Sequence, residues 1–170
     1  AETFYHREDQ WQIPGGAAKE NGVNPFMRHI ILKLPGEKES EFIFMTPFTP
    51  KGKDNLSAWM GARLDGEHYG KLGVFKFPKQ SLVYGPSHIA NRINQDTDIS
   101  SQLTLWDQKG SHVIRGELLV IPIEESLIYV QPIYLRADGG TIPELKRVVV
   151  AHENRVVMRE SLEAGIAEIF

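Results

Sequence analysis

The 170-residue chain contains no cysteine, and this absence excludes several kinds of site. Without thiols there is no disulfide, no thiolate zinc site and no cysteine nucleophile. The redox compartment stays open, because a cysteine-free domain folds equally well inside and outside the cytoplasm. The composition is therefore compatible with a location outside the cell.

Long apolar runs and an excess of positive charge are missing as well. The longest apolar stretches, such as residues 118–121, span a few residues, whereas a transmembrane helix needs about 20. The 19 Lys and Arg residues nearly balance the 22 Asp and Glu residues, so no basic field favours nucleic acid. The opening AETFYHR has neither the basic region nor the apolar run of a signal peptide. We expect no membrane span in this chain and no nucleic-acid partner.

Sequence motifs for catalysis, metals and phosphates are also lacking. The six histidines never fall in the HExxH spacing, and neither a P-loop nor a GxGxxG after a strand is present. The segment that begins DTDIS at residue 96 starts like a calcium loop, but Ser101 stands where glycine is needed and Asp107 where a bidentate glutamate is needed. We therefore predict no metal ligand, no catalytic residue and no cofactor.

The length and the order of turn signals predict an α+β fold with one domain. A chain of this size buries about 70% of its extended surface, which is enough for one core. Residues 1–25, rich in glycine and proline after residue 12, are predicted to form an N-terminal arm and loop, and residues 26–170 a single domain. Hairpins outnumber helices and do not alternate regularly with them, which favours α+β over a doubly wound sheet.

Four antiparallel hairpins and three helices make up the predicted domain. The hairpins pair MRHIILKL with EFIFM, residues 56–64 with 71–77, residues 113–123 with 127–135, and residues 147–152 with 155–158. Two short central helices follow Pro86 and Asp98, the second capped by Asp98, and a C-terminal helix follows a cap at Ser161. Pro47 and Pro50 require the strand that contains them to end there or to lie at an edge.

One loop gathers the residue types that bind ions or move protons. Arg63, Asp65, Glu67, His68 and Tyr69 lie within seven residues. Carboxylate and imidazole groups together can bind a divalent ion or shuttle a proton, so these five are the candidate ligand-binding residues. The alternative interpretation, which we favour, is a hydrophilic hairpin tip, because loops collect polar turn formers.

The chain resembles a known family along nearly its whole length. The residues that carry the resemblance include FIFMTPFTPKGKDNLSAWMGARLDGEHYGKLGVFKFPKQSLVYGP, INQDTDISSQLTLWDQKGSHVIRGELLVIPIEESLIYVQPIYLRA, IPELKRVVVA and SLEAGIAEIF. These are similar to uncharacterised protein family 0182, which consists of large bacterial integral membrane proteins. The resemblance implies that the chain is the C-terminal part of the soluble region that follows the transmembrane helices. It implies no activity, ligand or catalytic residue.

The expected function is that of a binding or interaction module in the extracytoplasmic part of a bacterial membrane protein. Its expected partners are the parent protein's own membrane helices or neighbouring envelope proteins. Two alternatives stay open, a hydrolase acting on envelope carbohydrate or peptide through Asp65, Glu67 and His68, and a small-ligand sensor domain. Converging carboxylates would favour the hydrolase, and a roomy pocket with polar groups would favour the sensor.

Overall fold

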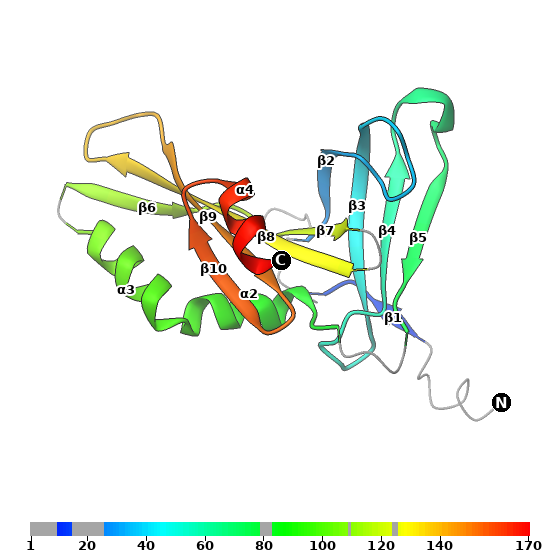
Figure 1. The fold of residues 1–170 in the computed structure, drawn as a ribbon, viewed down its shortest axis with the longest axis horizontal. Helices are drawn as coiled ribbons and strands as arrows, with labels where there is room; N and C mark the ends of the chain where they lie inside the picture. The colour runs from blue at the N-terminus through cyan, green and yellow to red at the C-terminus, as the bar shows by residue number, and fades with distance from the viewer. Residues whose placement is uncertain (1–9, 15–25, 79–82, 109, 124–125) are drawn as a thin grey trace. The chain divides into compact units, whose positions relative to one another are not determined.

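The computed structural model describes residues 10–14, 26–78, 83–108, 110–123 and 126–170 (Figure 1). Contacts divide the chain into two compact units, residues 1–88 with 122–127 and residues 89–121 with 128–170. Each unit is built around an antiparallel sheet. The predicted α+β class, the antiparallel hairpins, the two central helices and the C-terminal helix are confirmed. The predicted division into an arm of residues 1–25 and a single domain of residues 26–170 stays a prediction.

The first sheet has five strands. They are β1 (Trp11–Gln12), β2 (Arg28–Leu32), β3 (Glu41–Pro50), β4 (Ala58–Arg63) and β5 (Leu72–Lys76). β3 is central, with β4 and then β5 on one side and with β2 and β1 pairing its two ends on the other. Most of the predicted N-terminal arm, residues 1–9 and 15–25, lies outside the described residues.

Proline shapes the middle of β3. Pro47 pairs with Trp59 of β4. On its other side β2 reaches only as far as Met45 and β1 pairs only with Thr49 and Pro50, so within the described strands no partner there requires a donor from Pro47. The strand therefore continues through Pro47 because the proline lies at a local edge, as the sequence predicted. Ile43, Met45 and Trp59 are fully buried and form the core of this unit.

The second sheet has the order β10-β9-β8-β6, with β7 also pairing β8. Its strands are β6 (Ser111–Arg115), β7 (Leu119–Ile123), β8 (Ser126–Ala137), β9 (Glu144–His152) and β10 (Arg155–Arg159). Four consecutive residues of β9, Val148–Ala151, are buried, which indicates that this strand is covered on both faces. α4 (Leu162–Ile169) packs on β9 and β10.

Two helices precede this sheet in the chain, α2 (Pro86–Gln95) and α3 (Thr97–Trp106). Their predicted apolar stripes are confirmed, since Ile89, Ile93, Ile99 and Leu103 are buried. The predicted cap at Asp98 is wrong. The Asp96 carboxylate accepts the Ile99 N–H at 2.9 Å, so α3 begins two residues earlier. Within the part of the chain that is described, no helix has the length and apolarity needed to cross a membrane.

The segment 113–123 differs from the single predicted strand. It forms two strands, β6 and β7, which both pair with β8 and are separated by residues 116–118, beginning at Gly116. Gly116 donates its N–H to the Pro132 carbonyl at 2.8 Å and accepts from the Gln131 side chain at 2.9 Å. A Cβ at Gly116 would lie 2.5 Å from the Pro132 ring. This close approach requires glycine and interrupts the strand.

Candidate functional site

The first candidate residue, Arg63, joins two parts of the first sheet. It lies at the end of β4, and its guanidinium donates to both carboxylate oxygens of Glu41 and, at 2.8 Å, to Glu37. The hydrogen bond to Arg63 lowers the pKa of Glu41, and the hydrogen bonds to Glu41 and Glu37 raise the pKa of Arg63. Arg63 therefore links the end of β4 to the start of β3, through Glu41, and to the turn before β3, through Glu37.

Asp65 also has a structural partner. Both of its carboxylate oxygens accept the Phe42 N–H, at 2.9 and 3.0 Å. The backbone pairing of β3 with β4 ends at Ile43 and Arg63. Beyond it, the Asp65 carboxylate takes the place of a backbone acceptor for the Phe42 N–H. A carboxylate used in this way satisfies a backbone donor, which disfavours a role as a proton donor in catalysis.

Glu67, His68 and Tyr69 form the tip of the β4–β5 hairpin. Gly66–His68 is a single 3-10 turn. Its first residue, Gly66, and Gly70 after it both have positive φ. Glu67 is exposed, His68 half-buried and Tyr69 72% exposed. Across the described residues, no group of three His, Asp or Glu side chains is placed to hold a metal ion. The five candidates lie close together, and their ligand-binding role stays a prediction.

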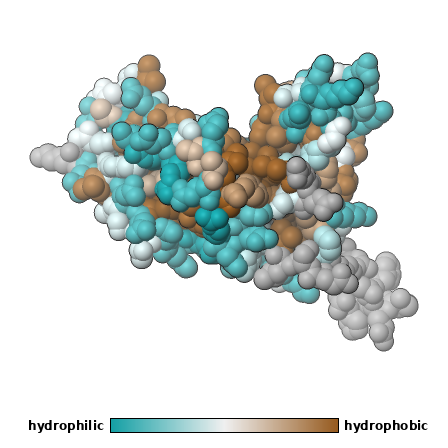
Figure 2. Space-filling model, in the orientation of Figure 1, coloured by the Kyte–Doolittle hydropathy of each residue, from teal (hydrophilic) through white to brown (hydrophobic). Residues whose placement is uncertain are grey.

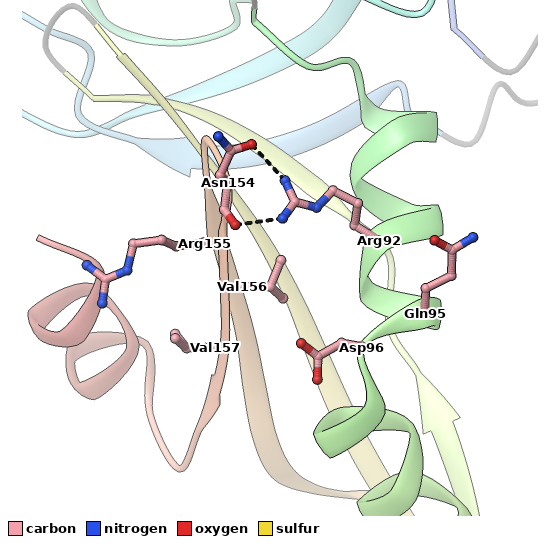
Figure 3. A pocket seen from close by; sticks show the side chains of 7 residues that line it. All are labelled: Arg92, Gln95, Asp96, Asn154, Arg155, Val156 and Val157. Atoms are coloured by element: carbon pink, nitrogen blue, oxygen red, sulfur yellow. Dashed lines mark hydrogen bonds between the residues drawn. The ribbon is translucent and has the colours of Figure 1, made fainter.

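The second unit contains a groove that was not predicted from the sequence. It lies between residues 92–102 of α2 and α3 and residues 154–159 around β10, and we refer to it as the edge groove. It consists of two adjoining cavities of about 440 Å³ each, which share Asp96, Val156 and Val157 as lining residues. Figure 3 shows the first of them, with Val156 on the side of α2 and α3, and Arg155 and Val157 on the side of α4.

Arg92 closes one end of the edge groove. Its guanidinium reaches from α2 to the β9–β10 turn, where it donates to the Asn154 carbonyl at 2.6 Å and to the Asn154 side chain at 3.1 Å (Figure 3). A third bond goes to the Glu153 carbonyl at 3.4 Å. These bonds fix the two-residue turn, in which Glu153 has a φ of 48°. Arg92 thus holds the helix and the hairpin at a fixed spacing.

The strand that lines the groove is the edge of its sheet. Among the described strands, β10 pairs with β9 alone. Arg155 lies opposite His152 across the two-residue turn, so these two form a hydrogen-bonded pair, and the alternation of an antiparallel ladder makes Val157 and Arg159 bond in the same way. The backbone groups of Val156 and Met158 consequently point away from β9, toward the groove.

The charged ends of β10 are held by α4. Arg155 donates to the carbonyls of Ile169 at 2.8 Å and Glu168 at 2.7 Å, and Arg159 pairs with the Glu168 carboxylate. Charged side chains at an edge strand usually protect it from pairing with other chains. Here both arginines bind α4, so the central residues of the edge strand, Val156 and Val157, carry no charge that would hinder pairing with another strand.

The site was missed because its parts are distant in the sequence. The hairpin of β9 and β10 was predicted from its turn, but nothing local indicates which of its strands ends the sheet. The second wall comes from residues about 60 positions earlier, as the Arg92–Asn154 bond shows. Val156 and Asp96 give no signal of their own in the sequence.

Comparisons with known proteins identify the chain's relatives. The UPF0182 protein of Trichodesmium erythraeum is 54% identical to it over 169 residues, and that of Bradyrhizobium diazoefficiens is 52% identical over 176 residues. The matches cover 99% and 100% of the chain, which spans 18% of the length of each relative. No solved structure gives a significant match. A family model described as "Uncharacterised protein family (UPF0182)" matches residues 1–106, and the chain belongs to this family.

Proposed function

We propose that the chain is a binding module that takes up an extended peptide segment as an additional strand on β10. The observation that carries this proposal is the edge groove, which runs along the whole outer side of an edge strand. All five residues of β10, Arg155–Arg159, line one or both of its cavities. A groove along a strand edge offers backbone groups to a ligand, whereas a groove over a sheet face offers side chains.

The energetics favour an extended ligand over a compact one. The outward N–H and C=O groups of Val156 can pair with the backbone of an added strand, and each such hydrogen bond contributes about 0.5–1.5 kcal/mol. The added strand's side chains alternate in direction, so one set would face α2 and α3 across the groove. Val156 provides the apolar contact at its centre. We therefore expect a segment with an apolar residue opposite Val156.

Proline at Val156 is expected to abolish this binding without unfolding the hairpin. Proline removes the outward N–H, and edge strands tolerate proline where the donor faces away from the sheet. The matched control is Val156→Thr, which keeps the N–H and the branched shape. For peptides selected from a random library against the natural chain, we expect Val156→Pro to weaken binding by about tenfold or more and Val156→Thr to change it little.

Two results would contradict the proposal. One is a selection that gives no peptide binding above background. The other is a set of bound peptides whose affinity is the same for Val156→Pro and for the natural chain. Circular dichroism of both variants shows whether the fold is retained, so that a loss of binding is not mistaken for unfolding.

We further propose that this module belongs to a bacterial membrane protein and lies outside the cytoplasm. The family resemblance supports this, together with the fact that more than four fifths of each relative's length lies outside the matched segment. The ligand segment would then come from the membrane protein itself or from a neighbouring envelope protein.

A single introduced cysteine tests the location. Tyr69 is 72% exposed, and the chain has no other cysteine. In intact cells that make a full-length family protein containing this chain, a membrane-impermeant maleimide should label Tyr69→Cys. Labelling that occurs only after lysis would place the chain in the cytoplasm and refute the location while leaving the peptide site open.

A further inference from the structure

One face of the first sheet carries an unusual number of exposed apolar side chains. Five of the exposed large apolar residues of the described chain belong to it, namely Trp11, Ile31, Phe42, Leu72 and Val74. Figure 2 shows brown, apolar side chains reaching the surface over the strands of this sheet. We refer to this side, defined by these five residues, as the apolar face.

The strand register places these residues on the same side of the sheet. Ile31 lies directly opposite Phe42 in the β2–β3 pair. Phe44, two residues beyond Phe42, lies opposite Ala62 of β4, and Ala62 lies opposite Leu72 of β5. Directly opposed residues point to one side and successive residues alternate, so Ile31, Phe42, Leu72 and Val74 share a side, with Ala62 of β4 between them. Trp11 lies opposite Pro50, an even number of residues from Phe42 on β3, and belongs to the same side.

The large side chains of the apolar face are exposed to an extent that usually indicates an interaction surface. Ile31 is 73% exposed, Leu72 64% and Val74 45%. Single exposed apolar side chains are common on proteins, but a contiguous patch across a sheet marks an interaction surface. On the opposite side of the same sheet Ile43, Met45 and Trp59 are fully buried, so the core of this unit lies there and the large side chains of the apolar face are the ones left exposed.

Among the positions that face this way on β2–β5, the charged residue is Lys76. Lys76 lies 5.8 Å from the centre of the Trp11 ring, and His29 stacks on Phe42 at 5.4 Å. None of the positions that face this way on β2–β5 is Asp or Glu. Two copies packed face to face would bring lysines together without a carboxylate, which disfavours self-association.

The size of the apolar face favours a tethered partner. Four strands about 4.8 Å apart and some five residues long give roughly 400 Å² of sheet, including side-chain margins. Stable complexes between separate proteins bury about 800 Å² on each side. A partner on the same polypeptide needs less area, because the tether gives it a high effective concentration.

In the relatives, a tethered partner for the apolar face can come from the rest of the same polypeptide. The chain spans 18% of their length, so each has several times as much polypeptide outside the matched region. We infer that the apolar face is covered by an apolar face of a strand or helix from the remainder of this longer polypeptide. The surface is independent of the edge groove, because all of its residues lie in the first unit.

Cysteine labelling can test the inference in two settings. One is the isolated chain, and the other is the Trichodesmium erythraeum relative in which this chain replaces the matching 169-residue segment. The test variants are Ile31→Cys and Leu72→Cys, and labelling is read on proteolytic peptides of the chain. Tyr69→Cys reports an exposed position off the face, and Ala58→Cys reports a position that is fully buried in the isolated chain.

We expect both test cysteines to react at least tenfold more slowly in the longer protein than in the isolated chain. Tyr69→Cys should react equally in both, and Ala58→Cys should stay unreactive in both, which shows that the chain is folded in each setting. Equal rates for the test cysteines in both settings would overturn the inference. Slow labelling of the test cysteines in the isolated chain would also overturn the inference. If that slow labelling depends on the protein concentration, it indicates self-association. Protection in the longer protein that disappears on extraction from the membrane would assign the face to lipid instead.

Discussion

Replacing Trp59 with alanine is expected to lower the free energy of unfolding by about 3–5 kcal/mol. Trp59 lies on β4 with no exposed surface. Its ring packs edge-on against Phe75 at 5.6 Å, and its indole N–H donates to the Met45 sulfur at 3.1 Å. The substitution removes this packing and leaves a cavity. Because domains are stable by about 5–15 kcal/mol, the loss is a large part of the total.

Urea unfolding followed by circular dichroism measures this effect. Tyr69→Ala is the control, because it also removes a large aromatic side chain from the β4–β5 hairpin but at a turn position that is 72% exposed. We expect Tyr69→Ala to change the stability by no more than about 0.5 kcal/mol. A loss below about 1 kcal/mol for Trp59→Ala would mean that β4 does not form the centre of this core.

The hairpins could be predicted because their signals are local. The run RHIIL pairs with EFIFM through a turn that contains Gly36, whose φ is positive. Apolar and β-branched residues on both sides of a polar turn are sufficient to indicate such a pair. The cap at Ser161 was predicted for the same reason, since its hydroxyl accepts the Ala164 N–H three residues away.

The interruptions could not be predicted, because they depend on distant residues. Gly116 separates β6 from β7 only because Pro132 lies against it. In the sequence, residues 113–123 form one β-rich run. The cap of α3 fails for a different reason. Asp96 and Asp98 are equally good cap residues, and the sequence does not indicate which of them ends the preceding helix.

The candidate site shows the same division. Sequence reasoning placed Arg63 and Asp65 in a polar hairpin loop, whereas the structure places Arg63 at the buried end of β4 and Asp65 just before the tip. It did not find their partners, because Glu37, Glu41 and Phe42 lie more than 20 residues earlier. Composition thus indicates where charged groups gather, whereas tertiary structure decides which of them are already engaged.

Alanine at Gly85 is expected to have the second large effect, a loss of about 3 kcal/mol, at the upper end of the usual cost of overpacking. Gly85 is buried just before α2, and a Cβ there would lie 2.0 Å from the Asp54 carbonyl oxygen. A backbone atom cannot move aside as a flexible side chain can. The loop must shift, which would break the bond between the Leu56 N–H and the Val83 carbonyl at 2.8 Å and the bridge between Asn55 and Tyr84.

Gly73→Ala on β5 separates this clash from the general effect of replacing a glycine. The nearest atom to a Cβ at Gly73 is 3.9 Å away, an ordinary contact, and its φ is not in the positive region. Since alanine has less conformational entropy to lose on folding, Gly73→Ala should leave the stability unchanged or raise it by up to about 1 kcal/mol. Urea unfolding of the two variants should therefore give changes of opposite sign or very different size. Equal losses at both positions would show that backbone entropy, and not the approach of Asp54, governs the cost at Gly85.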